Sequence, residues 1–328
     1  MTDRSANRPD PLLRVRHLTM EFVSAESAPA RAVEDVSFDV YPGQTLGLVG
    51  ESGCGKTTTM LSIMRLLPAA GHITSGEVLF DDIDLLRITE RQMRDYRWKE
   101  MAMVFQGAMN ALNPVRTVDD QISEAILLHE AIGREAADRR VIDLLDLVGI
   151  AKSRKNQYPH QYSGGMRQRA MIAMALICGP RLLIGDEPTT ALDVTIEAQI
   201  LDLIKGLQAD FGMAIMYISH DLAVVGEMAD EIMVMYLGLV MEHSSTDEIF
   251  DNPLHPYTAA LWRSIPTIDG KLERLIPISG SLPSPFAILP GCRFFSRCDR
   301  RMPGVCDASP PELKEVAPGH KVRCFLYQ

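Results

Sequence analysis

The sequence predicts an α/β fold with an antiparallel β edge, an inserted helical subdomain and a small Cys-rich C-terminal extension. Short apolar strands alternate with amphipathic helices, a pattern typical of a mostly parallel sheet covered by helices. The middle of the chain is mostly helical in pattern, and four of the six cysteines lie near the C-terminus. We therefore expect a principal domain at residues 1–265, with the helical subdomain at about 107–178, and an extension at residues 266–328.

The first elements follow from local patterns. Residues 13–22 and 32–40 alternate between apolar and polar side chains, which predicts two strands of an antiparallel edge. Residues 45–49 predict a buried strand that runs into a glycine-rich turn. Residues 57–67 then have helical spacing and stop before a proline. Strand, loop and helix together form the start of the α/β core.

Later elements repeat this alternation. Helical spacing is present at residues 122–128 and 141–148, within the predicted helical subdomain. Strands are predicted at residues 182–185 and 214–219, and residues 193–208 between them form an amphipathic helix. From residue 253 onward prolines and glycines become frequent, and residues 283–328 show no sustained period. We therefore expect something other than an apolar core to order this tail.

Composition excludes several classes of function. The formal net charge of −10 argues against binding to nucleic acid, which requires a basic surface. Apolar runs stay well short of the roughly 18 to 20 residues that cross a bilayer, so the chain itself forms no transport path. The N-terminus lacks the pattern of a secretion signal, so we expect the chain to stay in the cytoplasm.

A glycine-rich stretch after the predicted strand at residues 45–49 matches the P-loop pattern. Its backbone N–H groups would surround a phosphate, Lys56 would reach the β- and γ-phosphates of ATP, and the Thr57 hydroxyl would ligate Mg²⁺. A glycine-rich turn that binds nothing is the alternative. The residues predicted to bind nucleotide here are Gly50, Glu51, Ser52, Gly53, Cys54, Gly55, Lys56, Thr57 and Thr58.

Two carboxylates follow the strand predicted at residues 182–185. Asp186 would help to hold Mg²⁺, and Glu187 would act as the general base toward the attacking water. An acidic pair after an apolar run is also a common way for a strand to end in solvent, so the assignment depends on the P-loop.

The stretch that begins with Ser163, Gly164 and Gly165 and opens a predicted helix resembles the signature motif of ABC ATPases. A hydroxyl and closely spaced N–H groups at a helix start suit the γ-phosphate of a nucleotide held elsewhere. A plain helix N-cap explains the same residues. Met166 stands where many ABC ATPases have Gln, a difference that would weaken this half of the site.

Other positions extend the resemblance, in the order that the family has them. It implies that Gln106 touches Mg²⁺ and water, that His220 senses the γ-phosphate and that Asp193 belongs to a nucleotide-site loop. Phe22 is a candidate for stacking on adenine, although a core position on its strand explains it equally well. A thiol at a helix N-terminus has a lowered pKa, so we expect alkylation of Cys54 to block ATP hydrolysis and ATP to protect it.

Residues 252–258, Asn-Pro-Leu-His-Pro-Tyr-Thr, resemble the C-terminal hallmark of dipeptide and oligopeptide importer ATPases. The resemblance implies an ATPase at the cytoplasmic face of the bacterial inner membrane that powers peptide import. Its implied partners are a second, distinct ABC ATPase joined head to tail, two transmembrane permeases and an extracytoplasmic peptide-binding protein. The ATPase of a nickel, opine or sugar importer, or of an exporter, is the alternative. An ABC ATPase acting on ribosomes or DNA fits less well, because the chain is acidic and has a single ATPase unit.

The four C-terminal cysteines have the spacing Cys-x5-Cys-x7-Cys-x17-Cys. Four thiolates on one metal centre would order a segment that has few apolar positions. The spacing and the family resemblance favour a [4Fe-4S] cluster, with Zn²⁺ as the alternative, and nearby arginines would balance the thiolate charge. The predicted ligands are Cys292, Cys298, Cys306 and Cys324.

Overall fold

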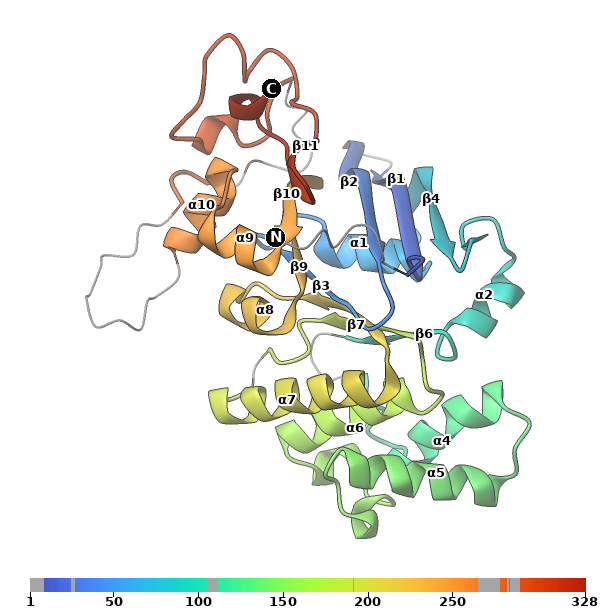
Figure 1. The fold of residues 1–328 in the computed structure, drawn as a ribbon. Coiled ribbons are helices and arrows are strands. Elements are labelled where there is room, and N and C mark those ends of the chain that lie inside the picture. The colour runs from blue at the N-terminus through green and yellow to red at the C-terminus, as the bar shows by residue number, and fades with distance from the viewer. Residues whose placement is uncertain are drawn as a thin grey trace. The chain divides into compact units, whose positions relative to one another are not determined.

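The computed structural model describes residues 9–24, 27–105, 111–190, 192–264, 278–281, 283 and 290–328. The chain divides into two compact units, whose elements are labelled in Figure 1. We call the unit formed by Leu13–Asp39, Thr45–Leu86 and Ile218–Gln328 the P-loop unit. The other, formed by Met1–Leu12, Val40–Gln44 and Arg87–Tyr217, we call the helical unit.

The P-loop unit contains an antiparallel sheet whose strands follow the order β2-β1-β4-β5. Leu13 lies opposite Phe80 in the antiparallel pairing of β1 with β4. The strands predicted at the N-terminal edge are confirmed, although both are longer than the sequence pattern indicated. The strands of this sheet are β1 (Leu13–Ser24), β2 (Ser27–Val40), β4 (Gly71–Phe80) and β5 (Ile83–Asp84).

Five further strands of the P-loop unit follow the order β11-β12-β10-β9-β3. The predicted buried strand is β3, which pairs in parallel with β9, whereas β10 pairs antiparallel with both β9 and β12. The strands are β3 (Thr45–Val49), β9 (Glu231–Tyr236), β10 (Leu239–Ser245), β11 (Lys314–Ala317) and β12 (His320–Val322). The helices of this unit are α1 (Lys56–Ile63), α8 (Leu222–Met228), α9 (Thr246–Asp251) and α10 (Pro256–Arg263), with short 3₁₀ helices η3 (Phe295–Arg297) and η4 (Phe325–Tyr327).

Strand pairing and apolar burial order the C-terminal segment, contrary to the expectation that its composition ruled this out. β12 adds to the sheet beside β10, and Val322 within it has no exposed surface. Phe294 is almost fully buried and packs against Tyr236 and Tyr257, at ring-centroid distances of 5.4 and 5.2 Å. A few large buried side chains and one strand pairing therefore order this segment, although it lacks the periodic apolar pattern of a helix or a strand.

In the helical unit three strands follow the order β8-β7-β6, and β6 pairs in parallel with β7. The strands are β6 (Met101–Val104), β7 (Leu182–Asp186) and β8 (Ala214–Ile218). The helices are α2 (Glu90–Tyr96), α4 (Val118–His129), α5 (Arg134–Leu147), α6 (Gly164–Leu176) and α7 (Val194–Phe211), with 3₁₀ helices η1 (Lys152–Arg154) and η2 (Pro159–Gln161).

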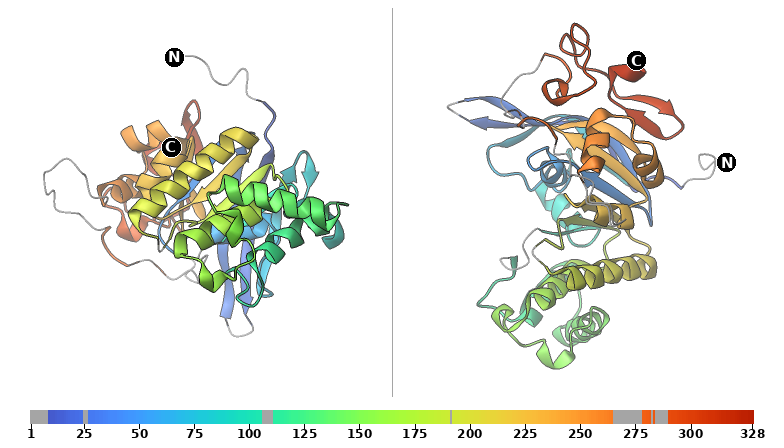
Figure 2. Two further views of the ribbon diagram at one scale, coloured as in Figure 1. Left: turned by 90° about the horizontal axis from the view of Figure 1, so that it is seen from below. Right: turned by 90° about the vertical axis from the view of Figure 1, so that its left-hand side faces the viewer.

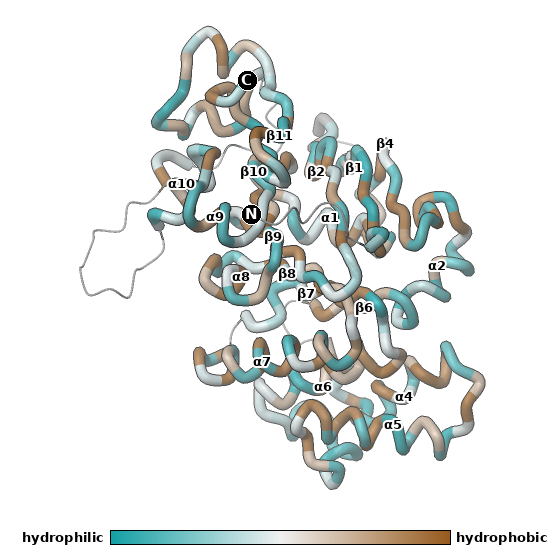
Figure 3. The backbone as a smooth tube through the Cα atoms, viewed as in Figure 1, coloured by the Kyte–Doolittle hydropathy of each residue, from teal (hydrophilic) through white to brown (hydrophobic). Residues whose placement is uncertain are grey.

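The helices α4, α5 and α6 contact one another, and α6 also contacts α7. The helices of this unit are grouped together in both views of Figure 2. Hydrophobic and hydrophilic segments alternate along α5 and α7 in Figure 3, as expected for helices with one buried face. Gly212 ends α7 in the left-handed conformation, with φ of 62°. Within the described part of the chain, no helix combines the length and the apolar character that crossing a membrane requires.

Candidate nucleotide site

The P-loop follows β3 and leads into α1, in a backbone conformation that requires glycine. Gly50 has φ of 146°, and a Cβ there would lie 2.2 Å from the carbonyl oxygen of Met235. Gly55 has φ of 106°, and its Cβ would lie 2.4 Å from the carbonyl oxygen of Ala32. Both positions therefore exclude any side chain on steric as well as conformational grounds.

Lys56 places a buried positive charge inside this loop. Its side chain is part of a residue that is only 6% exposed, and its Nζ donates to the carbonyl oxygens of Gly50 at 2.6 Å and Glu51 at 3.2 Å. Gly55, the N-cap of α1, makes no side-chain cap hydrogen bond, and the first N–H groups of a helix have no acceptor within the helix itself. An ammonium and a set of helix-start N–H groups are the donors that a phosphate requires, and the loop therefore fits one.

Cys54 does not have the lowered pKa that its position predicted. The residue is 1% exposed, and burial raises the pKa of its thiol even though Lys56 Nζ lies 3.6 Å from its Sγ. Desolvation of the thiolate outweighs the attraction of the ammonium and of the helix N-terminus. The expectation of a reactive thiolate is wrong, and Cys54 acts as a small buried filler beside Gly50.

His220 and Phe22 lie in the same unit as the P-loop. The N–H of Ser219 donates to the carbonyl oxygen of Leu48 in β3 at 3.4 Å. His220 is therefore the residue next to one that is hydrogen-bonded to the strand before the P-loop. Its side chain is exposed, and Asp221 caps α8 just beyond it. Phe22 is half-buried in β1, opposite Gly71. The proposed roles of His220 and Phe22 toward nucleotide stay predictions.

Asp186 is the last residue of β7 in the helical unit, and Glu187 follows it. All five residues of the strand are buried, including Asp186. Glu187 has φ of 48°, in the left-handed region, and its Oε2 accepts a hydrogen bond from the Thr190 hydroxyl at 3.0 Å. Backbone strain of this kind costs about 1 to 3 kcal/mol and occurs often at functional sites. The Thr190 hydroxyl therefore contacts the Glu187 carboxylate directly, at a residue with a strained backbone.

The signature residues have structural roles in the same unit. Ser163 is the N-cap of α6, where its Oγ accepts from the N–H of Met166 at 3.3 Å. A Cβ on Gly165 would lie 2.8 Å from Cγ2 of Ile196, so glycine here lets α6 approach α7 closely. Asp193 caps α7 and accepts from the N–H of Ile196 at 2.9 Å. The N-cap interpretation is therefore correct for Ser163, and its Oγ–H can still donate to an anion.

Gln106 lies outside the described residues. The predicted Mg²⁺ site combines Thr57 of the P-loop unit with Asp186 of the helical unit, and it stays a prediction because it draws on both units.

Comparisons with known proteins identify the family. Residues 33–190 match the family described as "ABC transporter", and residues 241–306 match "Oligopeptide/dipeptide transporter, C-terminal region". The chain is 46% identical over 320 residues to the oligopeptide transport ATP-binding protein AppD of Bacillus subtilis (strain 168), covering 97% of each chain. The chain belongs to the ABC transporter family.

Further relatives agree with this assignment. The chain is also 47% identical to the dipeptide transport ATP-binding protein DppD of Bacillus subtilis (strain 168), and the alignment covers 97% of this chain and 95% of the relative. It resembles the dimeric structure of the ATP-binding cassette MJ0796 bound to ADP and Pi, with a TM-score of 0.64 and 25% identity, over 71% of this chain and 98% of that one. The chain has the P-loop fold of ABC ATPases and is itself an ATPase.

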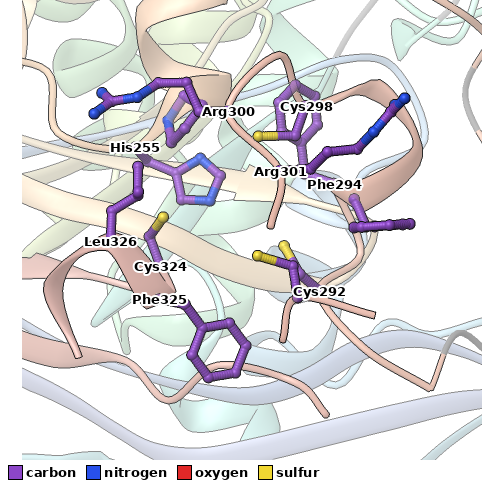
Figure 4. Close-up of a pocket in the computed structure, with 12 residues that line it drawn as sticks. His255, Cys292, Phe294, Cys298, Arg300, Arg301, Cys324, Phe325 and Leu326 are labelled. Atoms are coloured by element: carbon purple, nitrogen blue, oxygen red, sulfur yellow. The ribbon is translucent and has the colours of Figure 1, made fainter. Parts of the chain in front are cut away.

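The four C-terminal cysteines of this ABC ATPase line one pocket but do not form the predicted metal centre. Figure 4 shows Cys292, Cys298 and Cys324 projecting from separate segments around it. Among the described residues, which include all four cysteines, no group of three or more His, Cys, Asp or Glu side chains is arranged to hold a metal ion. Burial raises the pKa of Cys292 to about 11 and also raises the pKa of Cys298 and Cys324. The prediction of a [4Fe-4S] cluster, or of Zn²⁺ in its place, is therefore wrong.

Sequence reasoning also missed the partner of the C-terminal arginines. Arg297 was expected to balance thiolate charge, but its guanidinium pairs with Glu51 of the P-loop, 246 positions away in sequence. Arg293 pairs in the same way with Glu34 of β2. No local pattern could have indicated these pairs, because they depend on the tertiary fold of the P-loop unit.

Proposed function

We propose that this ABC ATPase energises the import of dipeptides or oligopeptides across the bacterial inner membrane. The observation that carries the proposal is the match of residues 241–306, outside the catalytic motifs, to the C-terminal region of oligopeptide and dipeptide transporters. Relatives named for oligopeptide and dipeptide transport align over nearly the whole chain, which supports the same conclusion.

In the proposed mechanism the P-loop binds the phosphates of ATP and the strand-end carboxylates act on its hydrolysis. Mg²⁺, held by Thr57 and Asp186, would neutralise charge on the phosphate oxygens. Glu187 would accept a proton from the attacking water, and His220 would contact the γ-phosphate. The buried Lys56 ammonium and the strained, hydroxyl-bonded Glu187 support these assignments.

The proposal divides the chain into a nucleotide-binding domain at residues 1–265 and a C-terminal extension at residues 266–328. Helices α4, α5 and α6 would form the helical subdomain at about residues 107–178. Ser163, Gly164, Gly165 and Asp193 would complete the ATP site of a second ABC subunit joined head to tail. The dimer described for MJ0796 supports this arrangement.

The proposed location is peripheral, at the cytoplasmic face of the membrane, in contact with two permeases and served by an extracytoplasmic peptide-binding protein. Closure of the two ATPases on ATP would move the permeases, and hydrolysis would reset them.

The hydrolytic part is tested with Glu187→Gln, which keeps the size of the side chain but removes the base. We expect the variant to bind ATP and to dimerise while steady-state hydrolysis falls at least about 100-fold. Normal turnover would eliminate Glu187 as the general base.

The transport part is tested by co-expressing the chain with the membrane subunits that co-purify with it. Uptake of labelled di- and oligopeptides into vesicles loaded with ATP is expected, and Glu187→Gln should abolish it. ATP-dependent uptake of nickel, an opine or a sugar, with peptides ignored, would instead assign the chain to another importer branch.

A further inference from the structure

The P-loop of this chain contains one acidic side chain, Glu51, next to the site where ATP would place its phosphates. A carboxylate at this place opposes the binding of a polyanion unless its charge is offset. The loop itself does not offset it, because the Lys56 ammonium donates to backbone carbonyl oxygens, including that of Glu51, and not to the Glu51 carboxylate. The compensation comes from the C-terminal segment.

Arg297, in η3, forms a bidentate ion pair with the Glu51 carboxylate. Nη1 donates to Oε2 at 2.5 Å and Nη2 donates to Oε1 at 2.9 Å. The Arg297 side chain is 4% exposed and that of Glu51 is 29% exposed, so water screens this pair only partly. The hydrogen bonds to Glu51 raise the pKa of Arg297 further above its ordinary value, so the arginine stays charged.

The guanidinium is itself fixed in place. Nε donates to the carbonyl oxygen of Ser279 at 3.0 Å, and Nη1 also donates to the hydroxyl of Tyr236 at 3.3 Å. Because these two bonds fix the guanidinium, the position of Arg297 sets the orientation of the Glu51 carboxylate that it binds.

A second contact, made by Tyr257 of α10, reaches the backbone of Glu51. Its N–H donates to the hydroxyl of Tyr257 at 2.9 Å, and Tyr257 has no exposed surface. The tyrosine is held in an aromatic cluster with Tyr236 and Phe294, at centroid distances of 4.7 and 5.2 Å. Tyr257 of α10 therefore contacts the main chain of Glu51, and Arg297 of the C-terminal extension contacts its side chain.

We propose that Arg297 is a positioning residue for ATP binding, which neutralises Glu51 and, together with Tyr257, holds the P-loop in its phosphate-binding conformation. This inference rests on nucleotide binding at the P-loop. It gives the C-terminal segment a direct role in nucleotide binding by this chain.

The test compares the full-length chain with variants in titrations of a non-hydrolysable ATP analogue with Mg²⁺. Arg297→Ala leaves the Glu51 charge beside the phosphates, and we expect the Kd to rise about tenfold, or ~1.4 kcal/mol. Adding Glu51→Gln to Arg297→Ala removes that charge and is expected to bring the Kd back to within about threefold of wild type. Arg263→Ala is the matched control, because Arg263 pairs with exposed Asp299 in the same segment and leaves the P-loop alone.

Rescue by the second substitution separates positioning from folding. If Arg297 only stabilises the C-terminal segment, Glu51→Gln cannot restore affinity, and an unrescued double variant overturns the proposal. An unchanged Kd in Arg297→Ala overturns it as well. ATP hydrolysis by the assembled transporter should show a raised KM with kcat close to wild type, since the chemical step does not involve Arg297.

If Arg297→Ala does not fold, Arg297→Lys replaces it, because lysine keeps the charge and loses the fork. The Kd is then expected to rise about threefold and to return on addition of Glu51→Gln; no rise, or no return, refutes the role. A wild-type chain that binds no nucleotide would overturn the nucleotide site as well, so failure of that site and failure of the positioning role give different results.

Discussion

Glu242 of β10 is a fully buried carboxylate, and its removal should destabilise the P-loop unit severely. Its side chain has no exposed surface and accepts three hydrogen bonds, from the N–H groups of Leu254 and His255 at 2.7 and 2.9 Å and from His320 Nε2 at 2.7 Å. Glu242→Ala leaves these three donors, two of them buried and one part-buried, without this acceptor, at about 1 to 3 kcal/mol each. We therefore expect the free energy of unfolding to fall by at least about 3 kcal/mol.

The measurement is urea denaturation followed by tryptophan fluorescence. Trp262 lies on α10, just beyond the segment that Glu242 holds, and a Trp98→Phe background makes it the sole tryptophan reporter. Glu248→Ala is the matched control, because Glu248 also approaches His320, at 3.9 Å, but is 56% exposed, and its loss should cost less than about 0.5 kcal/mol. Equal effects of the Glu242 and Glu248 substitutions would refute the argument from burial.

Three further predictions concern two buried side chains and one close helix–helix contact. Burial lowers the pKa of His255 to about 4, so the unfolded chain binds a proton at this residue at a higher pH than the folded chain does. The free energy of unfolding should therefore fall by about 3 kcal/mol between pH 6.5 and pH 4. His255→Asn, whose side chain can still accept the hydrogen bond from the Tyr257 N–H, should flatten this pH dependence in denaturation measured across pH. Cys54 is buried and its pKa is raised, so it should react with N-ethylmaleimide at least about 100-fold more slowly in the native chain than in urea. Mass spectrometry measures the extent of labelling, and rapid labelling of the native chain would contradict the burial of Cys54. Gly165→Ala should destabilise the helical unit by about 1 to 3 kcal/mol through its clash with Ile196, and Ile196→Ala in the same chain should relieve much of that loss if the clash is the cause.

Local patterns predicted most elements of the fold because the signals are local. The apolar run at residues 45–49 is β3 to the residue, and the glycines after it are required by positive φ and close backbone contacts. The amphipathic run at residues 193–208 became α7, which begins at Val194 and is capped by Asp193. Boundaries were less well determined: α1 ends at Ile63, four residues before the periodic pattern stops, because helical spacing does not show where hydrogen bonding ends.

The sequence by itself determined the family and the order of the predicted nucleotide motifs, since each motif is a short run of residues whose chemistry can be interpreted from the sequence alone. Tertiary structure alone decided the environment of each group. It buried Cys54 so that desolvation raised its pKa, arranged the four C-terminal cysteines around a pocket that lacks metal-binding geometry, and ordered the tail by pairing β12 with β10. It also brought Arg297 to Glu51, because charge pairing and burial depend on distances in space that sequence spacing does not encode.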